Sequence, residues 1–178
     1  RYIGPTETRL DEDLRSIKEI GALNDLFKNI KSQVGRLFVD KDDFIGKERG
    51  KKLLLFVASK HFGAEDWFKG HKITTSDVQE HHIFPRSLLK KKGVETRLID
   101  DVANIAFLTE KANKVISNMT PAQYFVESGI DKEKLKKQFV PMEEELWTLD
   151  RYEDFLCKRR KLIVEGVNRL FTDYGLET

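Results

Sequence analysis

The sequence contains little cysteine and no long hydrophobic run, and these two absences exclude several classes of protein. Its 178 residues include a single cysteine, Cys157, which excludes an internal disulfide and a cysteine-based zinc cluster. No apolar stretch approaches the roughly 18 residues that a membrane-spanning helix requires. A secretory signal pattern is also missing from the start of the sequence. We therefore expect a protein of the cytoplasm that has no membrane partner.

A strong excess of charge is missing as well. The 32 basic and 30 acidic residues leave a net charge of +2, which is too small to indicate a nucleic-acid partner by itself. Any basic surface must therefore be local. Charged residues make up 35% of the chain and hydrophobic residues 39%, and a chain of this length can bury a core without crosslinks. These proportions are typical of a globular protein.

Helical periodicity extends over most of the chain, so we expect an α+β fold that is mostly α. Apolar residues between positions 10 and 34 recur at spacings of three and four, which predicts two amphipathic helices. The apolar run at residues 53–58 predicts a buried central helix or a buried strand, and its leucines and Ala58 favour the helix. Shorter helices are expected at residues 122–126, 131–139 and 142–149. A long last helix is predicted after Asp150, which can cap it with Glu153; its apolar stripe consists of Tyr152, Phe155, Leu156, Ile163, Val167, Leu170 and Phe171.

The expected organisation is one domain over residues 1–178. A helical scaffold occupies residues 5–70, a central element residues 77–118, and C-terminal helices residues 120–174. Because the sequence begins at Arg1 rather than at a methionine and enters a Gly4-Pro5 turn at once, we expect that it was cut from a longer protein with domains upstream.

The central element combines two predicted strands with a helix. Residues 78–82 and 104–108 are the expected strands, and a long loop joins them. Thr109 is a good N-cap for a helix over residues 110–118. That helix carries Asn113 about one turn from its start. If the strands pair and the helix packs across them, polar side chains of all three segments can converge on one point.

The polar residues of this element have the chemistry of a metal-assisted hydrolase. A neutral imidazole of His81 or His82 and the amide oxygen of Asn113 can all bind a divalent cation. Adjacent residues of a strand point to opposite faces, so the two histidines need different roles or a bulge between them. One can bind the metal while the other removes a proton from water. Asn104 can fix the ring of the base through its other nitrogen or through the neighbouring backbone.

These residues resemble the HNH, or His-Me finger, nuclease motif. The motif opens with an Asp or His, then His-Ile-x-Pro, here residues 81–85, and continues with a middle Asn before an apolar strand, here Asn104. It ends with an Asn or His on the following helix, here Asn113. The flanks at residues 63–67 and 113–124 are similar to the C-terminal part of GmrSD-like proteins. That resemblance is close over about residues 50 to 127.

The resemblance implies a role for each of these residues. His82 is expected to be the general base, His81 and Asn113 the metal ligands, and Asn104 the residue that orients His82. Mg²⁺ suits a site with two protein ligands that water and phosphate oxygens complete, while the His at position 81 also makes Mn²⁺, Ni²⁺ or Zn²⁺ acceptable. The ββα-metal core therefore spans residues 77–118, surrounded by helices. The products implied have 5′-phosphate and 3′-hydroxyl ends.

The resemblance also implies a biological setting. GmrSD-like proteins carry an upstream ParB-like nucleotide-hydrolysing domain, and many act in anti-phage or modification-dependent restriction in bacteria and archaea. We expect duplex DNA as the substrate. Two alternatives stay open: a non-catalytic ββα module that binds nucleic acid, and a nuclease that acts on RNA.

Basic residues close to the motif are candidate contacts for backbone phosphates. They are Arg86, Lys90, Lys91, Lys92 and Lys114. The first four belong to the segment between the strands, which can equally be an ordinary solvated loop. A second basic run, residues 158–161, falls on the last helix, where its side chains spread around the circumference; we expect a solvated face there. Glu80 precedes the histidines and is expected to be a solvated carboxylate.

Overall fold

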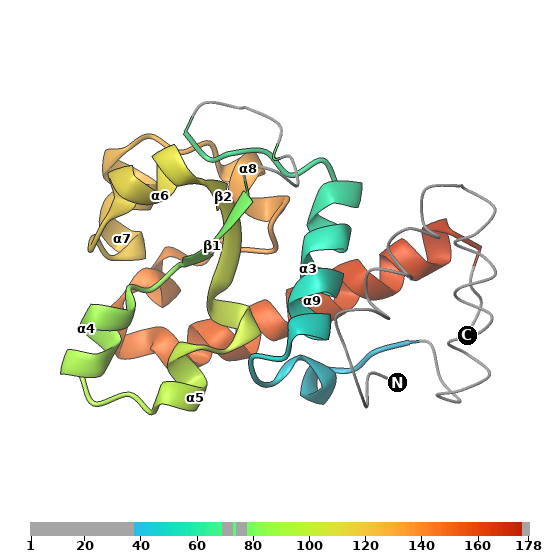
Figure 1. Ribbon diagram of the computed structural model, residues 1–178, viewed down its shortest axis with the longest axis horizontal. Helices are drawn as coiled ribbons and strands as arrows, with labels where there is room; N and C mark the ends of the chain where they lie inside the picture. The colour runs from blue at the N-terminus through green and yellow to red at the C-terminus, as the bar shows by residue number, and fades with distance from the viewer. Residues whose placement is uncertain (1–37, 69–72, 74–77, 176–178) are drawn as a thin grey trace. The chain divides into compact units, whose positions relative to one another are not determined.

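The computed structural model describes residues 38–68, 73 and 78–175 of the chain, and its elements are labelled as in Figure 1. The chain divides into two compact units, Arg1–Val39 with Asn168–Thr178, and Asp40–Val167. The second unit contains the HNH-like segment. The two amphipathic helices predicted between residues 10 and 34 lie outside the described residues, and the single-domain organisation stays a prediction.

The described residues are mostly helical, with one small antiparallel sheet, which confirms the expected α+β class. In chain order the described elements are η1 (Lys41–Phe44), α3 (Arg49–His61), β1 (Val78–His82), α4 (Arg86–Lys91), α5 (Thr96–Ile99), η2 (Val102–Asn104), β2 (Ile105–Thr109), α6 (Glu110–Ile116), α7 (Pro121–Glu127), α8 (Lys132–Lys136), η3 (Glu144–Trp147), η4 (Leu149–Arg151) and α9 (Tyr152–Asp173). No helix in the described part of the chain has both the length and the apolar character to cross a membrane.

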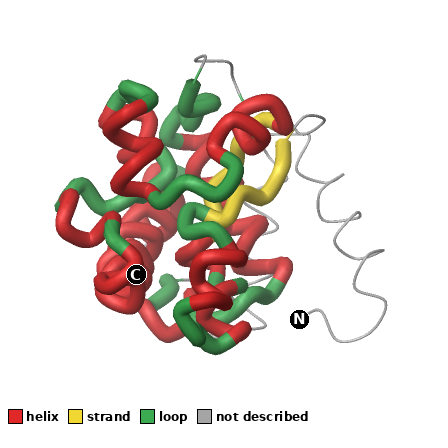
Figure 2. The backbone as a smooth tube through the Cα atoms, turned by 90° about the vertical axis from the view of Figure 1, so that its left-hand side faces the viewer, coloured by secondary structure: helices red, strands yellow, loops and turns green. Residues whose placement is uncertain are grey.

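The sheet is a two-stranded ribbon that positions the motif. Strands β1 and β2 pair in a continuous register from Val78 opposite Thr109 to His82 opposite Ile105. Figure 2 shows these two strands in yellow. Helix α6 follows β2 directly and packs against both strands, which completes the predicted ββα element. Because the register has no bulge, consecutive side chains of β1 point to opposite faces of the ribbon.

Helix α9 supplies the apolar surface under the segment that follows β1. Its predicted stripe is buried along the whole helix. The ring of Phe84 lies edge-on against Tyr152 and Phe155, with centroids 5.0 and 4.9 Å apart. Burial of two or three such side chains contributes several kcal/mol, about 1.5–3 for each. The Ile-Phe-Pro part of the motif is therefore anchored in the core.

The prediction of a solvated face at residues 158–161 is wrong for two of its members. Arg159 is fully buried, and its guanidinium donates to the backbone oxygens of Ala103 and Gln138, at 2.8 and 3.0 Å. Arg160 forms an ion pair with the buried carboxylate of Asp101. Both side chains are long enough to reach polar groups beside the start of β2, and those bonds offset the loss of hydration.

Two predictions about helices near the ribbon also need correction. The segment between the strands is not an open loop, since α4, α5 and η2 together occupy more than half of it. Pro85 stands at the N-cap of α4 with a fixed φ suited to a helix start. The helix predicted at residues 53–58 forms as α3, but it is not buried on all sides. Leu55 and Ala58 face the core while Val57 is 37% exposed, so only one side of the apolar run is fully buried.

Several helix ends differ from the prediction for local reasons. Helix α6 stops at Ile116, because Ser117 adopts a positive φ of 49°. Helix α8 is shorter than expected, because Phe139 has a φ of 58° and turns the chain out of the helix. Residues 142–149 form only the short turn η3, which ends where Thr148 becomes extended. Asp150 lies in η4 and pairs with Lys92 instead of capping the last helix.

Candidate active site

His81 and Asn113 meet where β1 faces α6. Nδ1 of His81 lies 2.8 Å from Oδ1 of Asn113. The amide orientation of Asn113 is supported from its other side, where Nδ2 donates to Oε1 of Gln79 at 3.3 Å. Gln79 and His81 share one face of β1 because they are two residues apart. The structure therefore brings together the two residues predicted to hold a metal.

The His81 ring lies in an apolar, aromatic surrounding. Its side chain is almost fully buried, with edge-on contacts to Trp67 and Tyr124 at centroid distances of 5.9 and 6.0 Å. Burial lowers the pKa of His81 from 6.5 to about 4, against the opposing effect of the Asn113 hydrogen bond. The imidazole is therefore neutral at physiological pH, as a metal ligand must be. Its Nε2 has no hydrogen-bond partner among the described residues.

The donor atoms of this pair fit a divalent cation. Two ligand atoms on neighbouring corners of an octahedral Mg²⁺ shell, each about 2.1 Å from the ion, are about 3 Å apart. The 2.8 Å between His81 Nδ1 and Asn113 Oδ1 is close to that separation, although in this structure the contact is a hydrogen bond, and metal binding at Nδ1 would require the tautomer with its proton on Nε2. Asn113 is partly exposed, which leaves room for water or phosphate oxygens. In the described part of the chain, no group of three or more His, Cys, Asp or Glu residues could hold a metal, so such a shell depends on non-protein ligands.

Asp66 fixes the start of the helix that carries Asn113. Its buried carboxylate accepts hydrogen bonds from the backbone N–H and the hydroxyl of Thr109, at 3.0 and 2.7 Å. The Thr109 oxygen in turn caps α6 by accepting from the N–H of Ala112. Asn113 therefore projects from a helical turn whose first residues are held by a buried acid.

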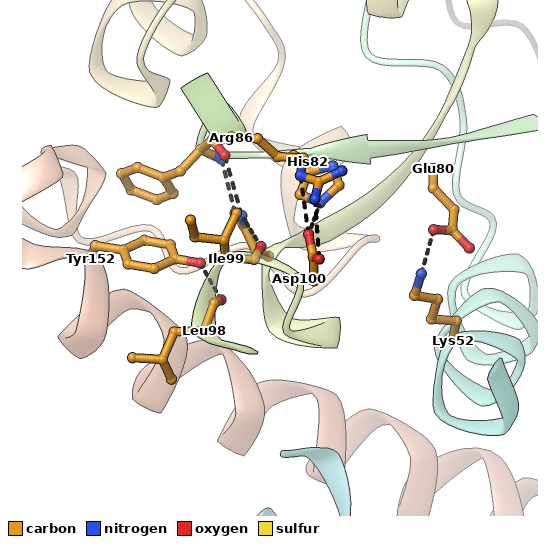
Figure 3. A network of polar contacts seen from close by, with 10 residues as sticks. Lys52, Glu80, His82, Arg86, Leu98, Ile99, Asp100 and Tyr152 are labelled. Atoms are coloured by element: carbon orange, nitrogen blue, oxygen red, sulfur yellow. Dashed lines mark hydrogen bonds and ion pairs between the residues drawn. The ribbon is translucent and has the colours of Figure 1, made fainter. Parts of the chain in front are cut away.

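His82 lies on the other face of the ribbon and has different partners. Its Nε2 lies 3.3 Å from Oδ1 of Asp100, the residue that follows α5 (Figure 3). The same carboxylate contacts the guanidinium of Arg86, with Nε 3.2 Å from Oδ1 and Nη2 3.2 Å from Oδ2. The His82 side chain retains 23% exposure. Partial burial lowers the pKa of His82, and the hydrogen bond and charge of Asp100 oppose that effect.

Asn104 is buried and acts on the backbone around His82. Its Oδ1 accepts from the N–H of Phe84 at 2.9 Å, and its Nδ2 donates to the carbonyl oxygens of Phe84 and Ile99, at 3.2 and 2.9 Å. Among the described contacts it has none with the His82 ring. Its contacts are thus with backbone groups of Phe84 and Ile99, and the role of Asn104 in orienting His82 stays a prediction.

The candidate phosphate-binding residues are not equivalent in the structure. Arg86 pairs with Asp100, Lys92 with Asp150, and Lys114 with Glu110. Lys90 and Lys91, by contrast, are exposed on α4 and form no ion pair with the described residues. Glu80 is not a free carboxylate, because it pairs with Lys52 of α3 on the face of the ribbon that also carries His82 (Figure 3).

Three residues of this region were missed from the sequence. Asp100 and Gln79 have no signal of their own, because a lone acid in a predicted loop and a lone amide in a strand are common. Asp66 had a stronger signal, since it lies in the segment at residues 63–67 that resembles GmrSD-like proteins. Each of the three is identified only by the hydrogen bonds it makes.

Comparison with known proteins identifies the family. Residues 33–162 match the family model described as "GmrSD restriction endonucleases, C-terminal domain", and this match covers more than half of the chain. The chain belongs to this family. It is therefore related to the nuclease domains of restriction endonucleases, which is the relationship predicted from residues 50–127. The His81–Asn113 pair, His82 and Asn104 all lie within the matched residues.

The similarity extends to a longer protein. An uncharacterized protein of Methanocaldococcus jannaschii is 25% identical, over 97% of this chain and 35% of its own length. The chain thus spans about a third of the length of that relative. No solved structure matches the chain.

Proposed function

We propose that this chain is a metal-dependent endonuclease domain of the HNH type that hydrolyses phosphodiester bonds in duplex DNA. The observation that carries the proposal is the pairing of His81 with Asn113 at 2.8 Å on one face of the ribbon, while the next residue, His82, faces the other side at the ribbon's end. Family membership supports the hydrolase class. Metal dependence and the HNH mechanism are the proposed additions.

The proposed reaction uses His82 as the general base. Its neutral imidazole takes a proton from a water molecule, whose oxygen attacks the phosphorus. The bond from phosphorus to the 3′ oxygen breaks, and that oxygen gains a proton from solvent, which yields 5′-phosphate and 3′-hydroxyl ends. A divalent ion held by His81 and Asn113, with Mg²⁺ preferred, would supply positive charge to the phosphoryl and leaving oxygens. Arg86 and Lys52, whose charges both act on His82, are suited to bind the phosphate next to it.

The domain would act as part of a larger restriction protein. A net charge of +2 gives weak, salt-sensitive DNA binding for the domain alone. The relative that matches over only 35% of its length supports a protein with further sequence outside this region. We infer that an upstream ParB-like nucleotide-hydrolysing domain supplies the choice of DNA, in anti-phage or modification-dependent restriction.

Plasmid nicking by the purified chain tests this proposal. The protein is incubated with supercoiled DNA in EDTA, Mg²⁺, Mn²⁺ or Ni²⁺, beside the His82→Ala variant. The expected result is nicking that requires a metal and is lost in His82→Ala, while folding and metal binding are retained. Normal cleavage by His82→Ala would overturn the assignment of the base.

The alternative functions give different results in the same assay. Cleavage of RNA but not of DNA would change the substrate class while keeping the site. Binding of DNA without cleavage under any metal, in this chain and also in the longer natural protein, would indicate a non-catalytic module.

A further inference from the structure

We propose that Asp100 is the positioning residue of His82: its carboxylate accepts the Nε2–H of the imidazole and thereby assigns Nδ1 as the atom that takes the proton from water. The inference rests on the proposed nuclease function, in which His82 is the base. It adds a residue that the motif does not contain, and it names the reacting nitrogen.

The chemistry of the contact fixes the tautomer. An ionised carboxylate can only accept hydrogen bonds, so the His82 nitrogen that faces Asp100 at 3.3 Å must carry the proton. In a neutral imidazole the other nitrogen then holds a lone pair. Nδ1 of His82 has no hydrogen-bond partner among the described residues, and the side chain keeps 23% exposure. The nitrogen without a described hydrogen-bond partner is therefore the basic one.

Asp100 is itself held in place by the backbone before it. The carbonyl oxygen of Leu98 accepts from the Tyr152 hydroxyl at 2.7 Å, and that of Ile99 accepts from the Asn104 amide at 2.9 Å (Figure 3). Tyr152 and Asn104 are both buried. Two consecutive carbonyls are thus fixed by two core side chains directly before the acid. A carboxylate on such a segment can hold a ring in one orientation, as the second partner of a histidine does in other hydrolytic sites.

The carboxylate of Asp100 also holds Arg86 beside His82. Arg86 contacts both oxygens of Asp100 and keeps its own side chain 48% exposed. Its guanidinium has five N–H groups in all, so some are free for a phosphate. Asp100 therefore sets the positions of both the proposed base and a cation beside it. In a purely structural role, Asp100 would serve only to pair with Arg86. The experiments must therefore distinguish pairing with Arg86 from positioning of His82.

The tautomer can be measured without any cleavage. Nitrogen-15 NMR of the histidine side chains in this chain, in EDTA at about pH 8 where imidazole is neutral, distinguishes Nε2–H from Nδ1–H, and His82→Gln identifies the signal. The wild type is expected to hold His82 in the Nε2–H form. Asp100→Ala is expected to convert it to a mixture, and Asp100→Asn, whose amide Nδ2 can donate to the ring nitrogen, is expected to lose the exclusive Nε2–H form as well. Arg86→Ala should leave the tautomer unchanged.

Kinetics provide the second readout. In Asp100→Ala, kcat should fall by an amount within the roughly 10²- to 10⁴-fold that a general base contributes, and Asp100→Asn should show a comparable fall, because an amide does not select the Nε2–H tautomer. Arg86→Ala should mainly raise KM. In the Arg86→Ala background, removing Asp100 should lower kcat further, which a role limited to pairing with Arg86 does not predict.

The outcomes are distinguishable from those that test the nuclease itself. A wild-type His82 in the Nδ1–H form, or a tautomer and a kcat that do not change in a folded Asp100→Ala protein, would overturn the inference. If the wild type cleaves nothing with any metal, the proposed nuclease function fails. In that case the NMR result still decides the positioning role, since an Asp100-dependent Nε2–H form supports it and its absence rejects it.

Discussion

Nδ1 of His81 lies 2.8 Å from Oδ1 of Asn113, although α4, α5, η2 and β2 separate the two residues in the chain. The neighbouring His82 points to the opposite face and contacts Asp100 instead. One ribbon thus carries two polar centres that its alternation keeps apart. This separation allows each histidine to be tested by itself.

The His81–Asn113 pair predicts a metal site that depends on both residues. Asn113→Ala should weaken Mn²⁺ binding to this chain by about 10- to 100-fold, because it removes one of two protein donors. A Mn²⁺ titration followed by water-proton relaxation measures this loss of affinity directly. Asn118→Ala is the matched control, since Asn118 is exposed and bonds only to Ser87 among the described residues. Equal binding by wild type and Asn113→Ala would contradict the proposed ligand set.

The buried His81 also predicts a pH dependence of stability in the metal-free protein. Its pKa is about 4 in the folded chain and about 6.5 when unfolded, so the unfolded state binds a proton first as the pH falls. The stability from the neutral ring is complete above about pH 6.5 and is lost progressively toward pH 4, up to about 3 kcal/mol. Urea unfolding in EDTA at a series of pH values measures it.

The matching variants separate this effect from general acid denaturation. His81→Gln keeps a polar side chain that cannot become charged, so its free energy of unfolding should change less between pH 6.5 and 4 than that of the wild type. Asn118→Ala changes an exposed side chain without an ionisable group and should follow the wild type. Identical pH profiles for wild type and His81→Gln would show that the ring is not desolvated in the fold.

The buried hydrogen bonds of Asn104 predict that its removal lowers the free energy of unfolding independently of metal. Asn104→Ala leaves the N–H of Phe84 and the carbonyl of Ile99 without their partners in a buried place, which should cost about 3 kcal/mol. Urea unfolding in EDTA measures the loss, and Asn118→Ala, at an exposed position, should cost well under about 1 kcal/mol. A loss seen only when metal is present would instead assign Asn104 to the metal site.

The strands and the helix that follows them could be predicted because their signals are local, whereas the pairing of His81 with Asn113 was expected from the resemblance to the HNH motif. An apolar run, a Thr at the N-cap and an Asn one turn later define β2 and α6 within a short stretch of sequence. The apolar stripe of α9 was predictable for the same reason, since it repeats at helical spacing. These features depend on nearest neighbours in the sequence rather than on the tertiary arrangement.

The contacts of Asp100 and Arg159 could not be predicted, because each depends on residues far away in the chain. Arg159 lies in a run of charges that reads as solvated, yet it is buried because two distant backbone oxygens, those of Ala103 and Gln138, can accept from it. Asp100 lies in a segment that lacks helical periodicity, where α4 and α5 are only one or two turns long. Periodicity is weak evidence over so few residues.

Gly166 predicts a steric effect on the packing of α9. A Cβ at this position would overlap the ring of Phe139, which is fixed on a residue with a φ of 58°. Gly166→Ala should therefore lower the free energy of unfolding by about 1–3 kcal/mol. Gly50→Ala on α3 is the matched control, because nothing lies within 4 Å of its Cβ, and it should be neutral or stabilising by up to about 1 kcal/mol. Equal effects of the two variants would show that Phe139 moves freely.

The exposed side chains of Lys90 and Lys91 predict that duplex DNA contacts the surface of α4. Both are exposed on α4, next to the segment that holds Arg86, and neither has an acidic partner among the described residues. Each phosphate contact contributes roughly 0.9 to the slope of log affinity against log salt, so the double variant Lys90→Ala/Lys91→Ala should reduce that slope by about one to two. Fluorescence anisotropy with a labelled duplex measures it.

A double variant on α8 distinguishes a real contact from loss of net charge. Lys132→Ala/Lys136→Ala removes the same charge, but these lysines are already paired with Glu144 and Glu133. Its salt slope should stay close to that of the wild type, with affinity reduced by less than about twofold, since a distant exposed charge is largely screened. If both double variants weakened binding equally, the protein would attract DNA only through its overall charge, and α4 would not be part of the interface. A smaller slope for the α4 variant alone would place the duplex over α4, beside the Arg86 and His82 pair that Asp100 holds.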